Sequence, residues 1–113
     1  MKKIIKCLAS TAVLISSTLI FIDAAAANDA AIEAGKTGAA VCMGCHGLQG
    51  EGKDAINGQP AFPRIAGQIK DYLIKSVNDY KADKRNDPMM SAIAKGLSDT
   101  EIVNIASYYS SLK

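Results

Sequence analysis

The stretch Cys42-Met43-Gly44-Cys45-His46 places two cysteines, separated by two residues, directly before the only histidine of the chain. This C-x-x-C-H spacing is the attachment signature of c-type haem. Each thiol can add across one vinyl group of the porphyrin, and the adjacent imidazole can then reach the iron as an axial ligand. The motif therefore predicts one covalently bound haem c, attached through Cys42 and Cys45 and ligated by His46.

Zinc binding and disulfide formation are the alternative interpretations of this motif. A structural zinc ion needs about four nitrogen or sulfur ligands, whereas the chain has one histidine and three cysteines, one of which is Cys7. A thioredoxin-like redox pair would stand beside a βαβ unit, but no strand pattern precedes Cys42. A plain disulfide between Cys42 and Cys45 fits the spacing, yet it gives the adjacent histidine no role.

The start of the chain has the three-part layout of a secretory signal peptide. Residues 1–6 are basic, residues 8–22 are apolar, and the alanines at 24–27 offer small-residue cleavage sites. The apolar run is short for a membrane-spanning helix, which argues against a retained anchor. We therefore expect a signal peptide over residues 1–27, cleaved near Ala27, and a mature chain without stable insertion in a membrane.

Residues 28–113 have the size of one small domain. A chain of this length buries a limited fraction of its surface, so an apolar cofactor would supply part of its core. The whole chain has a net charge of +2, but residues 1–27 carry that excess and the remainder is balanced. Residues 28–113 have no excess of basic residues that would indicate nucleic acid as a partner.

The pattern of residues predicts an all-α fold with three main helices and a loop-rich middle. The first helix should begin near Asn28 or Asp29, either of which can cap it. Apolar residues recur at steps of three or four over residues 69–80, which indicates a second amphipathic helix. Ser98 and Glu101 fit a capping box, which predicts that the last helix begins directly after Ser98.

The middle of the chain reads as loop. Glycines are dense over residues 44–58, and proline-containing sequence without periodicity follows;. A loop of this length in a small domain is usually functional, and here it would wrap the proximal side of the cofactor. We expect Pro88 to end any helix that precedes it and to bias Asp87 towards an extended conformation, with the following methionines placed between two helices.

The second axial position of the iron has few candidate ligands. The methionines beyond residue 27 are Met43, Met89 and Met90. Met43 lies inside the attachment motif, too near the ring edge to reach the other face of the haem. A thioether from Met89 or Met90 would favour ferrous iron and raise its potential. The alternatives are that both methionines fill gaps in the core, with a lysine ligand or an open site at the iron.

The sequence resembles class I cytochromes c, most closely the bacterial periplasmic cytochrome c4, c5 and c553-like group. The resemblance covers nearly all of residues 29–113. Besides the haem motif, the matching stretches are Gly35-Lys36, Phe62-Pro63-Arg64-Ile65-Ala66-Gly67-Gln68, residues 86–90, Leu97-Ser98-Asp99 and Ala106-Ser107-Tyr108-Tyr109.

This resemblance implies a small class I cytochrome c fold wrapped around one covalent haem. It implies a periplasmic electron carrier, not an enzyme, that passes electrons between respiratory redox partners such as a quinol-oxidising complex and a terminal oxidase. The family position of the methionine ligand, counted back from the Leu-Ser-Asp stretch, selects Met90 over Met89. The family also implies that the Pro63 carbonyl accepts a hydrogen bond from the imidazole of His46, which would fix its orientation.

Two further expectations come from the resemblance. Family members pack a glycine of the first helix against an aromatic residue of the last, which here would be Gly35 or Gly38 against Tyr108 or Tyr109. Cytochromes c4 carry two haem domains, whereas this chain has a single motif, so two copies could pair as a homodimer. A peroxidase-like or gas-binding protein with an open iron is the main rival function, and it usually needs a distal acid–base group.

Overall fold

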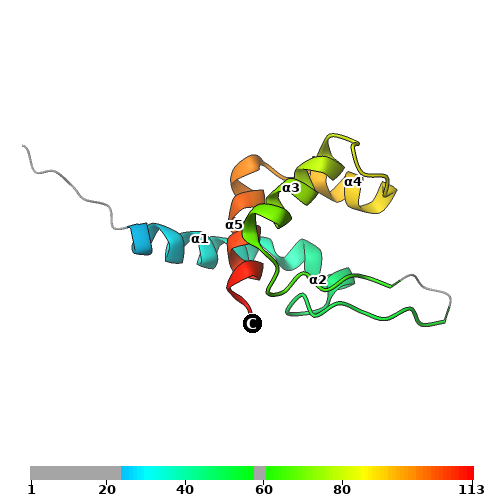
Figure 1. The fold of residues 1–113 in the computed structure, drawn as a ribbon, viewed down its shortest axis with the longest axis horizontal. Helices are drawn as coiled ribbons and strands as arrows, with labels where there is room; N and C mark the ends of the chain where they lie inside the picture. The colour runs from blue at the N-terminus through cyan, green and yellow to red at the C-terminus, as the bar shows by residue number, and fades with distance from the viewer. Residues whose placement is uncertain (1–23, 58–60) are drawn as a thin grey trace, which may run out of the picture.

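The computed structural model describes residues 24–57 and 61–113. Five helices occupy these residues, α1 (Ala24–Gly38), α2 (Ala40–His46), α3 (Lys70–Lys81), α4 (Pro88–Lys95) and α5 (Asp99–Ser111). No strand is present in this part of the chain, which confirms the predicted all-α class (Figure 1). None of the helices in the described ranges is long and apolar enough to cross a membrane.

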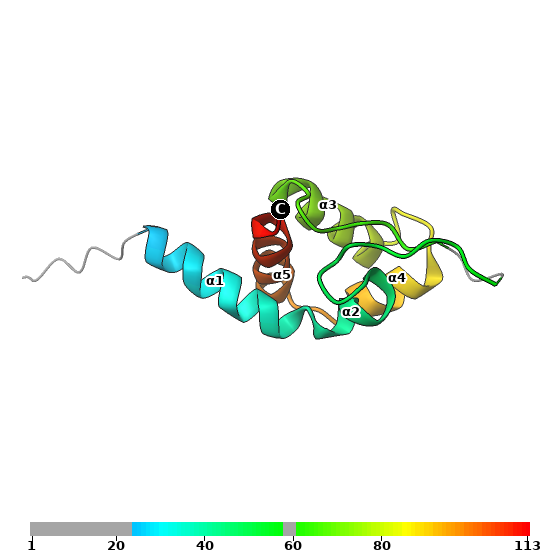
Figure 2. The ribbon, with the colours of Figure 1, turned by 90° about the horizontal axis from the view of Figure 1, so that it is seen from below.

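The crossing of α1 and α5 organises the molecule. Figures 1 and 2 show α5 passing across α1, with α2, α3 and α4 on one side of the crossing. A β-carbon at Gly35 would lie 1.9 Å from the Asn104 carbonyl oxygen and 2.9 Å from the β-carbon of Tyr108. Only glycine allows so close an approach. The crossing therefore pairs Gly35 with Tyr108, whereas Gly38 faces Ile105.

Helix α1 begins earlier than the sequence predicted. Its first residue is Ala24 and not a residue after Asn28 or Asp29, because an alanine run has the highest helix propensity of any sequence. The side chains of residues 24–30 are exposed. Residues 1–23, which hold most of the expected signal peptide, lie outside the described residues.

Two short helices were not predicted. Helix α2 contains the whole C-x-x-C-H motif. Asp87 is extended, as expected before a proline, but helix α4 begins at Pro88, and this helix start was not predicted. Asp87 caps the helix, its carboxylate accepting a hydrogen bond from the Met90 backbone N–H at 2.9 Å. Proline suits the first helical position, where no intrahelical N–H bond is needed.

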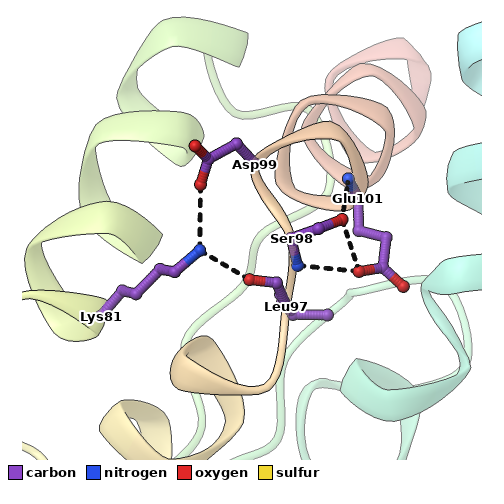
Figure 3. Close-up of polar contacts among 5 residues, drawn as sticks. All are labelled: Lys81, Leu97, Ser98, Asp99 and Glu101. Atoms are coloured by element: carbon purple, nitrogen blue, oxygen red, sulfur yellow. Dashed lines mark hydrogen bonds and ion pairs between the residues drawn. The ribbon is translucent and has the colours of Figure 1, made fainter.

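The predicted capping box at the start of α5 is confirmed. The Ser98 hydroxyl accepts from the Glu101 backbone N–H at 3.3 Å, and the Glu101 carboxylate accepts from the Ser98 backbone N–H at 2.8 Å (Figure 3). Lys81, the last residue of α3, donates to the Leu97 carbonyl at 2.7 Å and to Asp99 at 2.9 Å. These contacts hold the end of α3 against the start of α5.

Helix α3 occupies the predicted range, shifted by one residue, with Ile69 as its N-cap. Of its apolar stripe, Leu73 is buried, whereas Ile69 and Tyr72 are 74% and 52% exposed. Val77 and Tyr80, further along the stripe, are partly buried. The buried hydrophobic cluster joins this helix to α5 and to the α1–α2 junction, and consists of Ala39, Leu73, Ile105, Ala106, Tyr108 and Tyr109.

Candidate cofactor site

A cavity of about 300 Å³ lies among α2, α3, α4, α5 and the segment 61–68. Its volume is at the lower end of the range that small-molecule sites occupy. Most side chains in its wall are apolar, and the long segment between α2 and α3 contributes Phe62, Pro63 and Ile65. Figure 1 shows this segment running out and back beside α2, and an antiparallel bridge joins Lys53 to Phe62.

Helix α2 turns the three chemical groups of the motif toward this cavity. Residues three and four apart share one face of a helix, so Cys42, Cys45 and His46 all line the cavity wall. Both cysteines are half-buried free thiols, and His46 is only 7% exposed. Burial raises the pKa of the Cys42 thiol, which keeps it protonated and lowers its tendency to form a disulfide.

The imidazole of His46 is held by the segment that follows α2. Its Nδ1 lies 2.7 Å from the Pro63 carbonyl oxygen. A carbonyl can only accept, so Nδ1 carries the proton and Nε2 keeps its lone pair for a ligand. The ring also packs edge-on against Phe62, with 6.3 Å between the ring centroids. This is the contact that the family resemblance led us to expect at Pro63.

Hydrogen bonds to α5 and to Gly50 fix this segment in place. Gly50 has a φ of +75°, and a β-carbon there would lie 2.6 Å from the Tyr109 ring. Its carbonyl accepts from the backbone N–H groups of Ile65 and Ala66, both at 2.9 Å. The Gly67 N–H donates to the Tyr109 carbonyl at 2.8 Å. The carbonyl that meets the imidazole is therefore anchored to the last helix.

Helix α4 supplies the methionines. Both Met89 and Met90 line the cavity, so the structure brings either within the site that contains His46. Met89 is 51% exposed, whereas Met90 is half-buried. The capping hydrogen bond from Met90 N–H to Asp87 fixes the backbone at this position.

The sequence did not point to two polar groups in the cavity wall, those of Tyr109 and Arg85. The Arg85 guanidinium carbon lies 4.6 Å from the centroid of the Tyr80 ring. The Tyr109 hydroxyl is buried and has no hydrogen-bond partner in the described residues. Its spacing from Ile105 and Ala106 predicts that Tyr109 lies on the apolar stripe of the last helix, and all three residues are buried.

These residues fit a haem. The cavity offers an apolar wall, two free thiols on one helix face, an imidazole with a free Nε2 and thioethers on a second helix. An unpartnered buried hydroxyl also fits a cavity that takes a large cofactor. Within the described ranges, no three His, Cys, Asp or Glu side chains gather into a possible metal-ion site.

A small all-α chain with a C-x-x-C-H helix and a methionine-bearing helix around one cavity has the architecture of a class I c-type cytochrome. The family model described as Cytochrome c matches residues 32–113. The chain therefore belongs to the cytochrome c family, and its relatives place it with the cytochrome c4 group.

Curated relatives and solved structures give the same result. The chain is 42% identical over 88 residues to cytochrome c4 of Pseudomonas aeruginosa, covering 78% of this chain and 40% of that protein. It is 40% identical over 88 residues to cytochrome c-554(548) of Halomonas halodenitrificans, covering 75% of this chain and 98% of that protein. The crystal structure of cytochrome c4 from Pseudomonas stutzeri superposes with a TM-score of 0.64 at 30% sequence identity, covering 75% of this chain and 50% of that chain. The chain thus spans half or less of the cytochromes c4 it matches.

Proposed function

We propose that the chain is a periplasmic electron carrier with one haem c, attached through Cys42 and Cys45. The single observation that carries this proposal is the arrangement at α2, where both thiols share a cavity wall with His46, whose Nδ1 is bonded to the Pro63 carbonyl. When bound, the haem supplies a one-electron centre that cycles between ferrous and ferric iron.

The two cysteines would attach the cofactor by addition. Each thiol would form a thioether with one vinyl group and pass its proton to the other vinyl carbon, so that nothing leaves and no oxidant is consumed. The helical spacing of Cys42 and Cys45 holds both sulfurs on one side of the cavity. Their attachment would place His46 directly against the iron.

His46 and Met90 would hold the haem iron. The Pro63 carbonyl would orient the imidazole through the Nδ1 proton. The greater burial of Met90 supports it over Met89 as the second ligand. A site with both positions filled would exchange electrons without making or breaking a ligand bond, which is the property that separates a carrier from a haem enzyme.

Electrons would pass at the cofactor edge near Cys42 and Cys45. Val41 lines the cavity beside Cys42 and is 51% exposed, so an exposed apolar side chain would border that edge. Transient redox contacts are typically small. The redox partners would be proteins such as a terminal oxidase and a quinol-oxidising complex, and the balanced charge of residues 28–113 predicts weak dependence of docking on salt.

Export would depend on the signal peptide over residues 1–27. Cleavage near Ala27 would fall in the exposed first turns of α1, which start at Ala24. The shortened helix would then begin at Asn28, a residue that suits a helix start.

Haem staining of the denatured, exported chain tests the proposal. A covalent haem survives denaturation, so the wild-type band should stain. The doubly substituted chain, Cys42→Ala with Cys45→Ala, should not stain. An unstained wild-type chain, co-expressed with a haem-attachment system that loads a control cytochrome, would refute the proposal.

A further inference from the structure

The hydroxyl of Tyr109 is a buried polar group without a described role. Tyr109 is 1% exposed, and within residues 24–57 and 61–113 its hydroxyl is the buried side-chain polar atom that lacks a hydrogen-bond partner. An unsatisfied buried hydroxyl costs free energy, and in native proteins such groups usually meet a ligand or a water molecule. The hydroxyl should therefore have a partner in the loaded protein.

The position of this hydroxyl is fixed by tight packing. The Tyr109 ring lies so close to Gly50 that a β-carbon there would come within 2.6 Å of it. The Tyr108 ring packs against the Tyr109 ring, with 5.1 Å between the ring centroids. The Tyr109 carbonyl accepts a hydrogen bond from the Gly67 N–H at 2.8 Å. A ring held in this way cannot turn its hydroxyl elsewhere.

Cys42 is the group of chemical interest beside this hydroxyl. Both residues line the cavity, and Cys42 packs against the buried cluster that contains Tyr109. Burial, and next the proximity of Cys42, raise the pKa of Tyr109, with smaller effects from Tyr108 and Glu51. The hydroxyl therefore stays protonated over the physiological range and remains a hydrogen-bond donor.

We propose that Tyr109 is a positioning residue for the haem, and that its hydroxyl donates a hydrogen bond to the Cys42 sulfur once that sulfur is a thioether. This inference rests on the proposed function. Attachment moves the thiol proton of Cys42 to a vinyl carbon, so the sulfur can then only accept. The hydrogen bond would fix the edge of the porphyrin that is bonded to Cys42. It would also withdraw electron density from the porphyrin, which favours ferrous iron.

The variant Tyr109→Phe tests this proposal, and Tyr108→Phe is its matched control. Tyr108 is the adjacent tyrosine, is also buried and does not line the cavity. We expect Tyr109→Phe to load haem but to lower the ferrous-to-ferric ratio at a fixed ambient potential by about twofold, since one weak hydrogen bond is lost. Tyr108→Phe should leave the ratio unchanged.

Proton NMR of the ferrous wild-type protein gives a second measurement that needs no variant. The Tyr109 hydroxyl proton should exchange slowly with water and show a nuclear Overhauser contact to the Cys42 β-protons. A hydroxyl proton in contact only with other groups, or an unchanged ratio in Tyr109→Phe, would overturn the proposal. In a Cys42→Ala background that keeps attachment through Cys45, a persisting effect of Tyr109→Phe would overturn it as well.

These outcomes separate the inference from the function on which it rests. A wild-type chain without covalent haem refutes both the proposed function and the role of Tyr109. A haem-loaded wild-type chain in which Tyr109→Phe changes neither the redox ratio nor the hydroxyl resonance refutes the role of Tyr109 alone.

Discussion

The bond between His46 and Pro63 decides which imidazole nitrogen is available at the site. Since the Pro63 carbonyl accepts the Nδ1 proton at 2.7 Å, Nε2 is the ring nitrogen left to act as a ligand. The acceptor is a backbone group, and its segment is fastened to Tyr109 through Gly67. Orientation of the proposed ligand is thus built into the fold of residues 61–68.

The choice between the methionines is testable by substitution. Met90→Ala should let carbon monoxide bind the ferrous haem and should lower the midpoint potential, because a thioether ligand stabilises ferrous iron. Carbon monoxide difference spectra and redox titration are the measurements. Met89→Ala, which alters the more exposed neighbour on the same helix, is the control and should leave both properties nearly unchanged. The opposite ranking would make Met89 the ligand.

Among the helices, α1 and α5 pack most closely, at the crossing where Gly35 meets Asn104 and Tyr108. Gly35→Ala would place a β-carbon 1.9 Å from the Asn104 carbonyl oxygen, so the helices must separate. We expect the free energy of unfolding to fall by about 3 kcal/mol, as measured by chemical denaturation of the holoprotein. Gly96→Ala is the control, because Gly96 has an ordinary helical φ of −78° and its nearest contact would be 3.4 Å. Equal stability of the two variants would contradict this account of the crossing.

The capping box of α5 predicts a pH dependence. Hydrogen bonds from the Ser98 backbone and hydroxyl lower the pKa of Glu101, so its carboxylate stabilises the fold above the ordinary carboxyl pKa. That contribution is lost as the pH falls through the lowered folded value. Glu101→Gln should therefore be less stable than the wild type at neutral pH, and the difference should shrink in acid.

Denaturation curves from pH 7 to about pH 3 would measure this difference, since unperturbed glutamate titrates near 4.3. Glu33→Gln, on the exposed side of α1, is the control and should show no comparable trend. A stability difference that grows on acidification would contradict the assignment.

Some helices could be predicted from the sequence and others could not. Ser98 and Glu101 predicted the start of α5 because a capping box is a local signal. Helix α2 is too short for apolar periodicity to reveal it, and α4 was missed because a proline that ends one helix can equally begin another. The bond between His46 and Pro63 came from family resemblance alone. The role of the Tyr109 hydroxyl needed the structure, since burial without a partner depends on long-range packing.

At the scale of the whole molecule, the cavity takes the place of part of the core. A space of about 300 Å³ lies among α2, α3, α4 and α5, and a cavity of this kind is costly when empty. The haem would therefore be a structural component of so small a domain as well as its redox centre.

The chain without cofactor should consequently be poorly stable. We expect the doubly substituted chain, Cys42→Ala with Cys45→Ala, to lose cooperative thermal unfolding and its near-ultraviolet circular dichroism. The haem-loaded wild type should show both, and it serves as the reference. A sharp unfolding transition of similar midpoint in the haem-free chain would show that the fold does not depend on the cofactor.

The visible spectrum of the exported protein tests the central claim most directly. It should be recorded for the oxidised protein, the reduced protein and the reduced protein under carbon monoxide. Ligation by His46 and Met90 predicts a six-coordinate low-spin haem, the near-red ferric band of methionine ligation, and no response to carbon monoxide. A high-spin or carbon monoxide-reactive haem would contradict the electron-carrier account in favour of ligand binding or peroxide chemistry, and a spectrum without haem would contradict it altogether.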